Sequence, residues 1–214
     1  MEKDDLRERW DQTCCSIGIS DSRSRTTWED LVRRYSERHR RYHTLDHLRA
    51  MCRTLSEFEE EFAASDSVYI AVFFHDAIYD SSSTTNEKDS AELATSFLTK
   101  NNVAASVIQV VEQLILATAS HSNETNVPDA EWFLDSDLAI LAAQPEISSE
   151  YVQAIREEYS QFSDAEFRTG RLRFLKTILD APILYRTAVL RERFEASARR
   201  NLQNELATLL SDSL

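Results

Sequence analysis

Histidines next to aspartates are the residues of this chain best suited to chemistry. The chain has five histidines: His39, His43, His47, His75 and His121. Three of them fall within HRRYHTLDH, and His75 is followed by Asp76 at the end of the apolar run VYIAVFFHD. An ionised aspartate in such a segment costs several kcal/mol unless something compensates it. Imidazole nitrogen and carboxylate oxygen are both metal ligands, so a divalent cation compensates both groups at once. The alternative is that Asp76 caps a helix or pairs with an arginine, with His75 as a hydrogen-bonded core residue.

A second candidate carboxylate lies in FLDSDLAIL. On a helix, Phe133, Asp137 and Leu141 share one face at i, i+4 and i+8, which directs Asp137 towards the core. Asp135 lies about 200° around the helix and is expected to face solvent or the helix start. The sequence therefore predicts that Asp137 and the two histidine segments converge on one ion.

The three clustered histidines also allow a rival arrangement. At i, i+4 and i+8, His39, His43 and His47 would form a zinc-like stripe on one helix. Thr44, however, is the predicted N-cap of a helix over 44–62, so that His39 and His43 precede the helix and only His47 lies in its first turn. His39, among arginines, is expected to be solvated.

The elements that must position these groups are helices. The chain has 2 glycines and 3 prolines, whereas an average chain of this length carries roughly 15 and about 10. This scarcity disfavours turn-rich sheets and excludes glycine-rich phosphate loops. Apolar periodicity, with a Thr26–Glu29 capping box, predicts helices over about 3–15, 26–37, 44–62, 68–80, 86–100, 103–119, 129–143, 149–162, 165–179 and from Pro182 onward. The fold class expected is all-α: a single domain, residues 1–214, of eight to ten helices.

The net charge, the cysteines and the hydropathy of the chain limit the classes of partner and the cellular compartment that we expect. The formal net charge of −13 disfavours binding to duplex nucleic acid, although a bound metal reverses the sign locally. Three cysteines without a CxxC motif are expected to be buried, reduced residues. The charged N-terminal segment is no secretory signal and no run is long enough to span a membrane, so a cytoplasmic protein is expected. The long last helix offers a surface for a homo-oligomer.

The order of these groups resembles a known signature. His47, His75–Asp76 and Asp137 follow the H…HD…D pattern of the HD-domain metal-dependent phosphohydrolases, which are helical bundles that hold one or two divalent ions. Residues 42–47, YHTLDH, also resemble the YHNxxH motif of the distantly related cyclic-nucleotide phosphodiesterases. Most closely, RRYHTLDHL, FFHDAIYD, NEKDSAEL and FLDSDLAIL together resemble predicted HD-superfamily phosphohydrolases of about 200 residues.

The resemblance implies an enzyme that cleaves a phosphomonoester or phosphodiester with metal-activated water. A nucleotide is one candidate substrate. Its ligands would be His47, His75, Asp76 and Asp137, and its cofactor one or two ions of Mn, Fe, Co, Ni, Zn or Mg. Asp76 would also bridge a second ion or orient the water. The alternative is a catalytically silent HD-type module that binds a nucleotide or signals to a partner.

Further roles follow for residues around this set. His43 would protonate the departing oxygen, unless it is a capping or surface residue. Glu87 would orient the water or cap its helix. The small phosphorylated substrate would contact Arg41, which otherwise belongs to a solvated basic face, together with Asp80 and His121.

Overall fold

The computed structural model describes residues 3–119 and 127–211, and every regular element within them is helical. The all-α prediction is therefore confirmed. Ten α-helices and two 3₁₀ segments lie in these ranges: α1 (Lys3–Ser16), α2 (Asp21–Tyr35), α3 (Leu45–Ser56), η1 (Glu59–Glu61), α4 (Ser65–Phe74), α5 (Asn86–Lys100), α6 (Ala105–Ala117), α7 (Ala130–Asp137), η2 (Leu138–Ala142), α8 (Pro145–Glu158), α9 (Asp164–Asp180) and α10 (Ala188–Ser211). None of the described helices is long and apolar enough to cross a lipid bilayer.

The chain forms two compact units, residues 1–134 and 135–214. The boundary falls inside α7, which continues without a break from Ala130 to Asp137. The grouping of all 214 residues into one domain stays a prediction.

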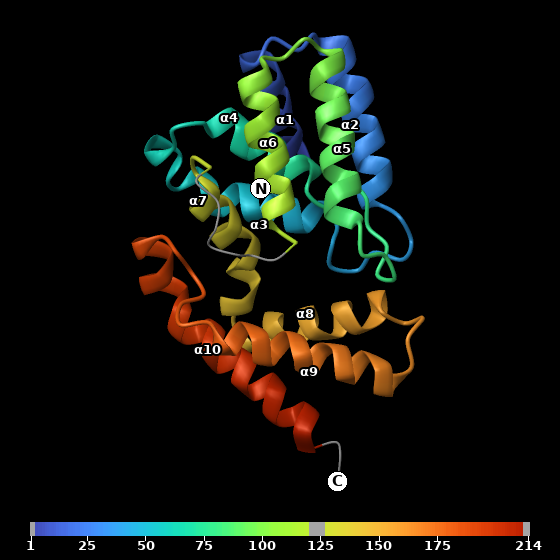
Figure 1. The fold of residues 1–214 in the computed structure, drawn as a ribbon, viewed down its shortest axis with the longest axis vertical. Coiled ribbons are helices and arrows are strands. Elements are labelled where there is room, and N and C mark those ends of the chain that lie inside the picture. Colours follow the sequence, from blue (N-terminus) through green and yellow to red (C-terminus); the bar gives the residue numbers. More distant parts are fainter. Residues whose placement is uncertain (1–2, 120–126, 212–214) are drawn as a thin grey trace. The chain divides into compact units, whose positions relative to one another are not determined.

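In the first unit, α4 is the centre of the core. All its residues from Ser67 to Phe74 are buried, and it packs against α1, α3, α5 and α6. Figure 1 shows α1, α2, α5 and α6 with roughly parallel axes, and α1 packs against α2 and α5 against α6. By its composition, an apolar run of this length is compatible with a buried strand as well as with a buried helix. It is a helix, because apolar helix surfaces enclose it on several sides.

Several helix ends of this unit differ from expectation. The helix predicted over 68–80 is α4, which spans Ser65–Phe74 and ends before His75. α2 begins at Asp21, so the predicted capping box at Thr26 is wrong: the Thr26 hydroxyl donates to the Ser22 carbonyl one turn earlier. α3 begins after Thr44, as predicted, and the Thr44 hydroxyl accepts from the Asp46 amide. It ends at Ser56, before the acidic run 59–61, because carboxylates at a helix C-terminus oppose the helix dipole.

In the second unit, η2 packs against α8 and α10, and α9 packs against α10. A buried arginine joins the last two helices: Arg171 donates through Nε and Nη2 to both carboxylate oxygens of Glu205, at 2.6 and 3.0 Å. The last helix starts at Ala188, six residues after Pro182. Before it, the backbone amides of Leu184 and Tyr185 donate to the Glu195 carboxylate.

The expectation that Asp135 faces solvent is wrong. The residue is 1% exposed, and its carboxylate accepts hydrogen bonds from the Arg186 amide and from the Thr187 amide and hydroxyl, each at 2.8 Å. Burial raises the pKa of Asp135, and these donors offset part of that rise. The carboxylate thus satisfies amides just before α10, an interaction between residues 51 or more positions apart that helix periodicity does not contain.

We expect Asp135→Ala to lower the free energy of unfolding of the second unit by about 3 kcal/mol, because three buried donors lose a charged acceptor. Chemical denaturation monitored by circular dichroism measures the change. Asp180→Ala, at an exposed position at the end of α9, is the control and should change the free energy by under about 0.5 kcal/mol. Equal effects of the two substitutions would contradict this role of Asp135.

The cysteines are free thiols: Cys14 and Cys52 are buried as expected, whereas Cys15 is exposed, which corrects the expectation for that residue. Burial raises the pKa of Cys14 to about 12 and the pKa of Cys52 to about 12. A thiol with such a pKa is ionised to only about one part in 10⁴ at pH 8, and its thiolate fraction grows tenfold per pH unit above that.

We therefore expect one of the three thiols to react rapidly with a disulfide reagent at pH 8 in the native protein, and all three in denaturant. The spectrophotometric thiol count measures this. Cys15→Ser should abolish the rapid phase, whereas a rapid phase that survives in this variant would show that a buried thiol is accessible.

Candidate functional site

The end of α4 carries the first two groups of the site. His75 is the C-cap residue of the helix and is 1% exposed. Its Nδ1 lies 3.0 Å from the Val72 carbonyl oxygen. Because a carbonyl only accepts, Nδ1 is the protonated nitrogen, and the lone pair of a neutral His75 is on Nε2.

His47 meets this nitrogen from the first turn of α3. His47 is 5% exposed, and its Nε2 lies 3.2 Å from His75 Nε2. Its other nitrogen, Nδ1, is hydrogen-bonded to the Tyr42 hydroxyl at 3.0 Å. Asp76 completes the group: Oδ2 lies 3.0 Å from His75 Nε2 and 3.9 Å from His47 Nε2. Two nitrogens and one carboxylate oxygen from two distant segments thus converge.

Electrostatics favour a positive charge at this point. Three atoms with lone pairs face one another, and each repels the others unless a proton or a cation lies among them. Burial by itself raises the pKa of the Asp76 carboxyl, but the His75, His43 and His47 imidazoles outweigh it and hold that pKa well below its usual range. The donor set, two imidazoles and an ionised carboxylate, is one that divalent transition metals bind, so the residues present fit a metal ion.

His43 lies beside this cluster, just before α3. Its half-buried imidazole stacks on the Tyr79 ring at 4.2 Å between centroids and lies 6.1 Å from the His47 ring. It also contributes to the lowered pKa of Asp76. The structure thus brings His43 to the cluster without making it part of the converging trio.

Arg41, Asp80 and Glu87 are further predicted site residues of the first unit. Arg41 is exposed and donates to the carbonyl oxygens of Arg38 and Arg40. The exposed Asp80 carboxylate accepts from the Ser82 amide and hydroxyl, which lowers its pKa. Glu87 is half-buried in the first turn of α5. Their roles towards substrate or water stay predictions.

Asp137 and His121 are the remaining predicted site residues. Asp137 is the last residue of α7 and belongs to the second unit. Phe133, one turn earlier on the same helix, lies in the first unit and packs edge-on against the His75 ring. A ligand role for Asp137 stays a prediction. His121 lies outside the described residues.

Sequence reasoning missed Arg40, which it placed in a solvated basic face. Arg40 is 3% exposed. Its guanidinium donates to the carbonyl oxygens of His43 at 3.2 Å, Asp76 at 2.7 Å and Ala77 at 3.2 Å. No feature of the run ERHRR, residues 37–41, distinguishes Arg40, because its acceptors are mainly backbone groups that any residue provides.

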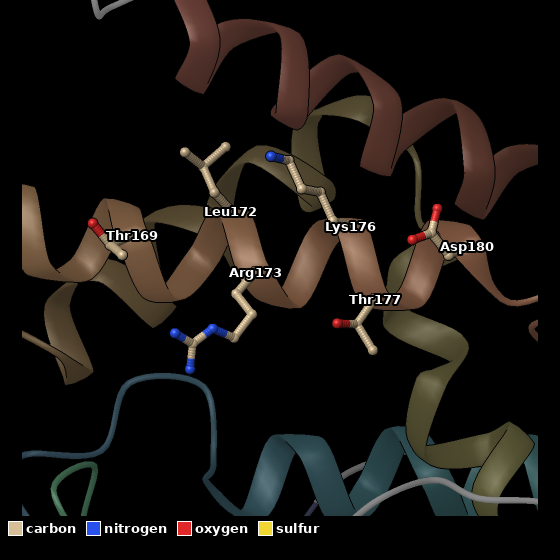
Figure 2. A pocket seen from close by; sticks show the side chains of 6 residues that line it. All are labelled: Thr169, Leu172, Arg173, Lys176, Thr177 and Asp180. Atoms are coloured by element: carbon tan, nitrogen blue, oxygen red, sulfur yellow. The ribbon is translucent and has the colours of Figure 1, made fainter.

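The second unit carries a hollow along α9, lined by Thr169, Leu172, Arg173, Lys176, Thr177 and Asp180. Figure 2 shows Arg173 and Lys176 leaving the helix on different sides, so their charges do not converge on one ligand. This open helix face offers no catalytic grouping comparable to the histidine cluster.

Compared with protein-family models, with curated proteins and with solved structures, the chain matches none.

The Tyr42–His47 hydrogen bond gives a test of the site that needs no ligand. We expect Tyr42→Phe to lower the free energy of unfolding by about 1 kcal/mol, because a partly buried imidazole nitrogen loses its hydroxyl partner. Denaturant unfolding measures the change.

Tyr69→Phe is the matched control. The Tyr69 hydroxyl is buried and has no hydrogen-bond partner among the described residues. Its removal should leave stability unchanged or raise it, since an unsatisfied buried hydroxyl costs free energy. A Tyr42→Phe protein as stable as the wild type would contradict the assigned bond.

Proposed function

We propose that this protein is a metal-dependent phosphohydrolase of the HD type that cleaves a phosphomonoester or phosphodiester. The observation that carries the proposal is the convergence of His47, His75 and Asp76 at the end of α4, a helix that is buried from Ser67 to Phe74. Three such groups in one place are expensive to bury together without a cation. The resemblance of the four motifs to the HD phosphohydrolases adds the reaction class.

His47 and His75 would hold the ion through Nε2, and Asp76 through its carboxylate. Their orientation is prepared by partners on the far nitrogens, Tyr42 for His47 and the Val72 carbonyl for His75. When bound, a divalent cation supplies Lewis acidity that favours ionisation of water near neutral pH and neutralises phosphoryl charge. Asp137 is the proposed fourth ligand.

His43 is the proposed proton donor. In hydrolysis, water adds to phosphorus, the P–O ester bond breaks, and the departing oxygen takes a proton from the His43 imidazole, which regains one from the water. Its half-buried ring lies beside the ligands without joining them.

The second candidate function is an HD-type module that binds a nucleotide without cleaving it. The two candidates share the metal ligands and differ in whether His43 matters for turnover. A screen of the wild type against phosphorylated metabolites, with phosphate release as the readout, separates them.

We expect the purified protein to contain near-stoichiometric divalent metal by elemental analysis. Asp76→Ala should abolish both metal and activity. His43→Ala should keep the metal and lower kcat by about 10²–10⁴-fold, the typical contribution of a general acid.

His39→Ala is the matched control: it removes an exposed histidine of the same segment and should retain both metal and activity. If Asp76→Ala kept full metal and activity, the ligand assignment would be wrong. Loss of metal in His43→Ala would make His43 a ligand, and a metal-loaded wild type that cleaves no phosphate ester would favour the silent module.

A further inference from the structure

We propose that Arg40 is a positioning residue whose guanidinium fixes the metal-binding segments against each other, so that the metal affinity of the site depends on it. This inference rests on the proposed function. It assigns to Arg40 no contact with metal or substrate.

The contacts join two parts of the chain that carry the site. One bond goes to the carbonyl of His43, directly before α3 with its His47. Two go to the carbonyls of Asp76 and Ala77, directly after α4 with its His75, at sequence separations of 36 and 37. The guanidinium thereby sets how closely the start of α3 approaches the end of α4.

The burial of Arg40 indicates that this arrangement is specific. Its side chain is fully buried, and a guanidinium left unpaired there would strongly destabilise the fold. Three carbonyl oxygens and the Glu37 carboxylate, 3.2 Å from Nε, accept its hydrogen bonds. Aromatic rings cover it as well: its Cζ lies 5.0 Å from the Tyr35 centroid and 5.4 Å from the Tyr79 centroid.

The positions of these acceptors require arginine rather than lysine. The planar guanidinium presents five donors in a rigid fork, whereas a lysine ammonium presents three donors at a single atom. A lysine at position 40 would keep the positive charge near the end of α4, where the helix dipole favours it. It would not span the carbonyls of both segments at once. Tyr79 adds a second connection, because its ring also stacks on His43.

The experiment measures the divalent-metal dissociation constant of wild type and Arg40→Lys by competition with a chromogenic chelator, using zinc as the probe. We expect a rise of about 10–100-fold in Arg40→Lys, the usual cost of disturbing groups that orient metal ligands. Glu37→Gln weakens the hold on the guanidinium without removing it and should raise the constant by a smaller factor. It also serves as the test if Arg40→Lys does not fold.

Two controls separate positioning from loss of charge or of stability. Arg38→Lys changes an exposed arginine of the same loop. Arg171→Lys changes another buried arginine, bound to Glu205 in the second unit. Circular dichroism checks that both variants are folded. Both should then bind zinc with the same dissociation constant as the wild type.

A metal-free readout addresses the geometry itself. In protein labelled with ¹⁵N-histidine, Arg40→Lys should shift the ring signals of His43, His47 and His75, and Arg171→Lys should not.

The outcomes are distinguishable. Wild-type zinc affinity in both Arg40→Lys and Glu37→Gln would overturn the role of Arg40 and leave the proposed function standing. A wild type that binds no divalent metal would overturn the proposed function and, with it, the dependence of metal affinity on Arg40.

Discussion

Two imidazoles and a carboxylate meet at the end of the most apolar helix of the chain, and their mutual repulsion is the constraint around which the first unit is organised. The convergence of His47, His75 and Asp76 requires a proton or a metal ion among these atoms, because their lone pairs otherwise repel one another. The apolar surroundings of α4 make that requirement strict, because little water is present to screen the charges.

Two arginines are buried in the part of this acidic chain that the structure describes, and they show different ways to stabilise a cation. Arg171 is bound to both oxygens of one carboxylate and neutralises it. Arg40 is bound mainly to backbone carbonyls, which are dipoles rather than charges, and these carbonyls belong to two separate segments. The first arrangement joins two helices through a pair of side chains. The second joins two backbones, and so constrains the residues next to them more directly.

The sequence was most informative where structure is local. The buried run of α4, the Thr44 N-cap and the start of α5 near Asn86 all follow from residue types within one or two turns. It failed where a distant segment determines the outcome. Asp135 is buried where the backbone of residues 186 and 187 donates to it, and Arg40 is buried where carbonyl groups 36 and 37 positions away accept its hydrogen bonds. In α2, the Thr26 hydroxyl could either cap a helix that begins there or donate to a carbonyl one turn earlier in a longer helix. It does the second, because residues 21–25 are already helical. The candidate ligands His47, His75 and Asp76 were visible because buried charge is rare enough to require an explanation.

The hydrogen bond from His75 to the carbonyl three residues before it has a consequence for how the site assembles. That imidazole is oriented by its own helix, and His47 by a tyrosine five positions earlier in the chain. The orientation of each ring is therefore set within a short segment of the chain, and only the approach of these two segments to each other depends on the rest of the unit. Substitutions elsewhere in the core should then change how closely the two rings approach each other rather than the orientation of each ring. Evolution could therefore change the metal affinity of the site without changing the orientation of its imidazoles.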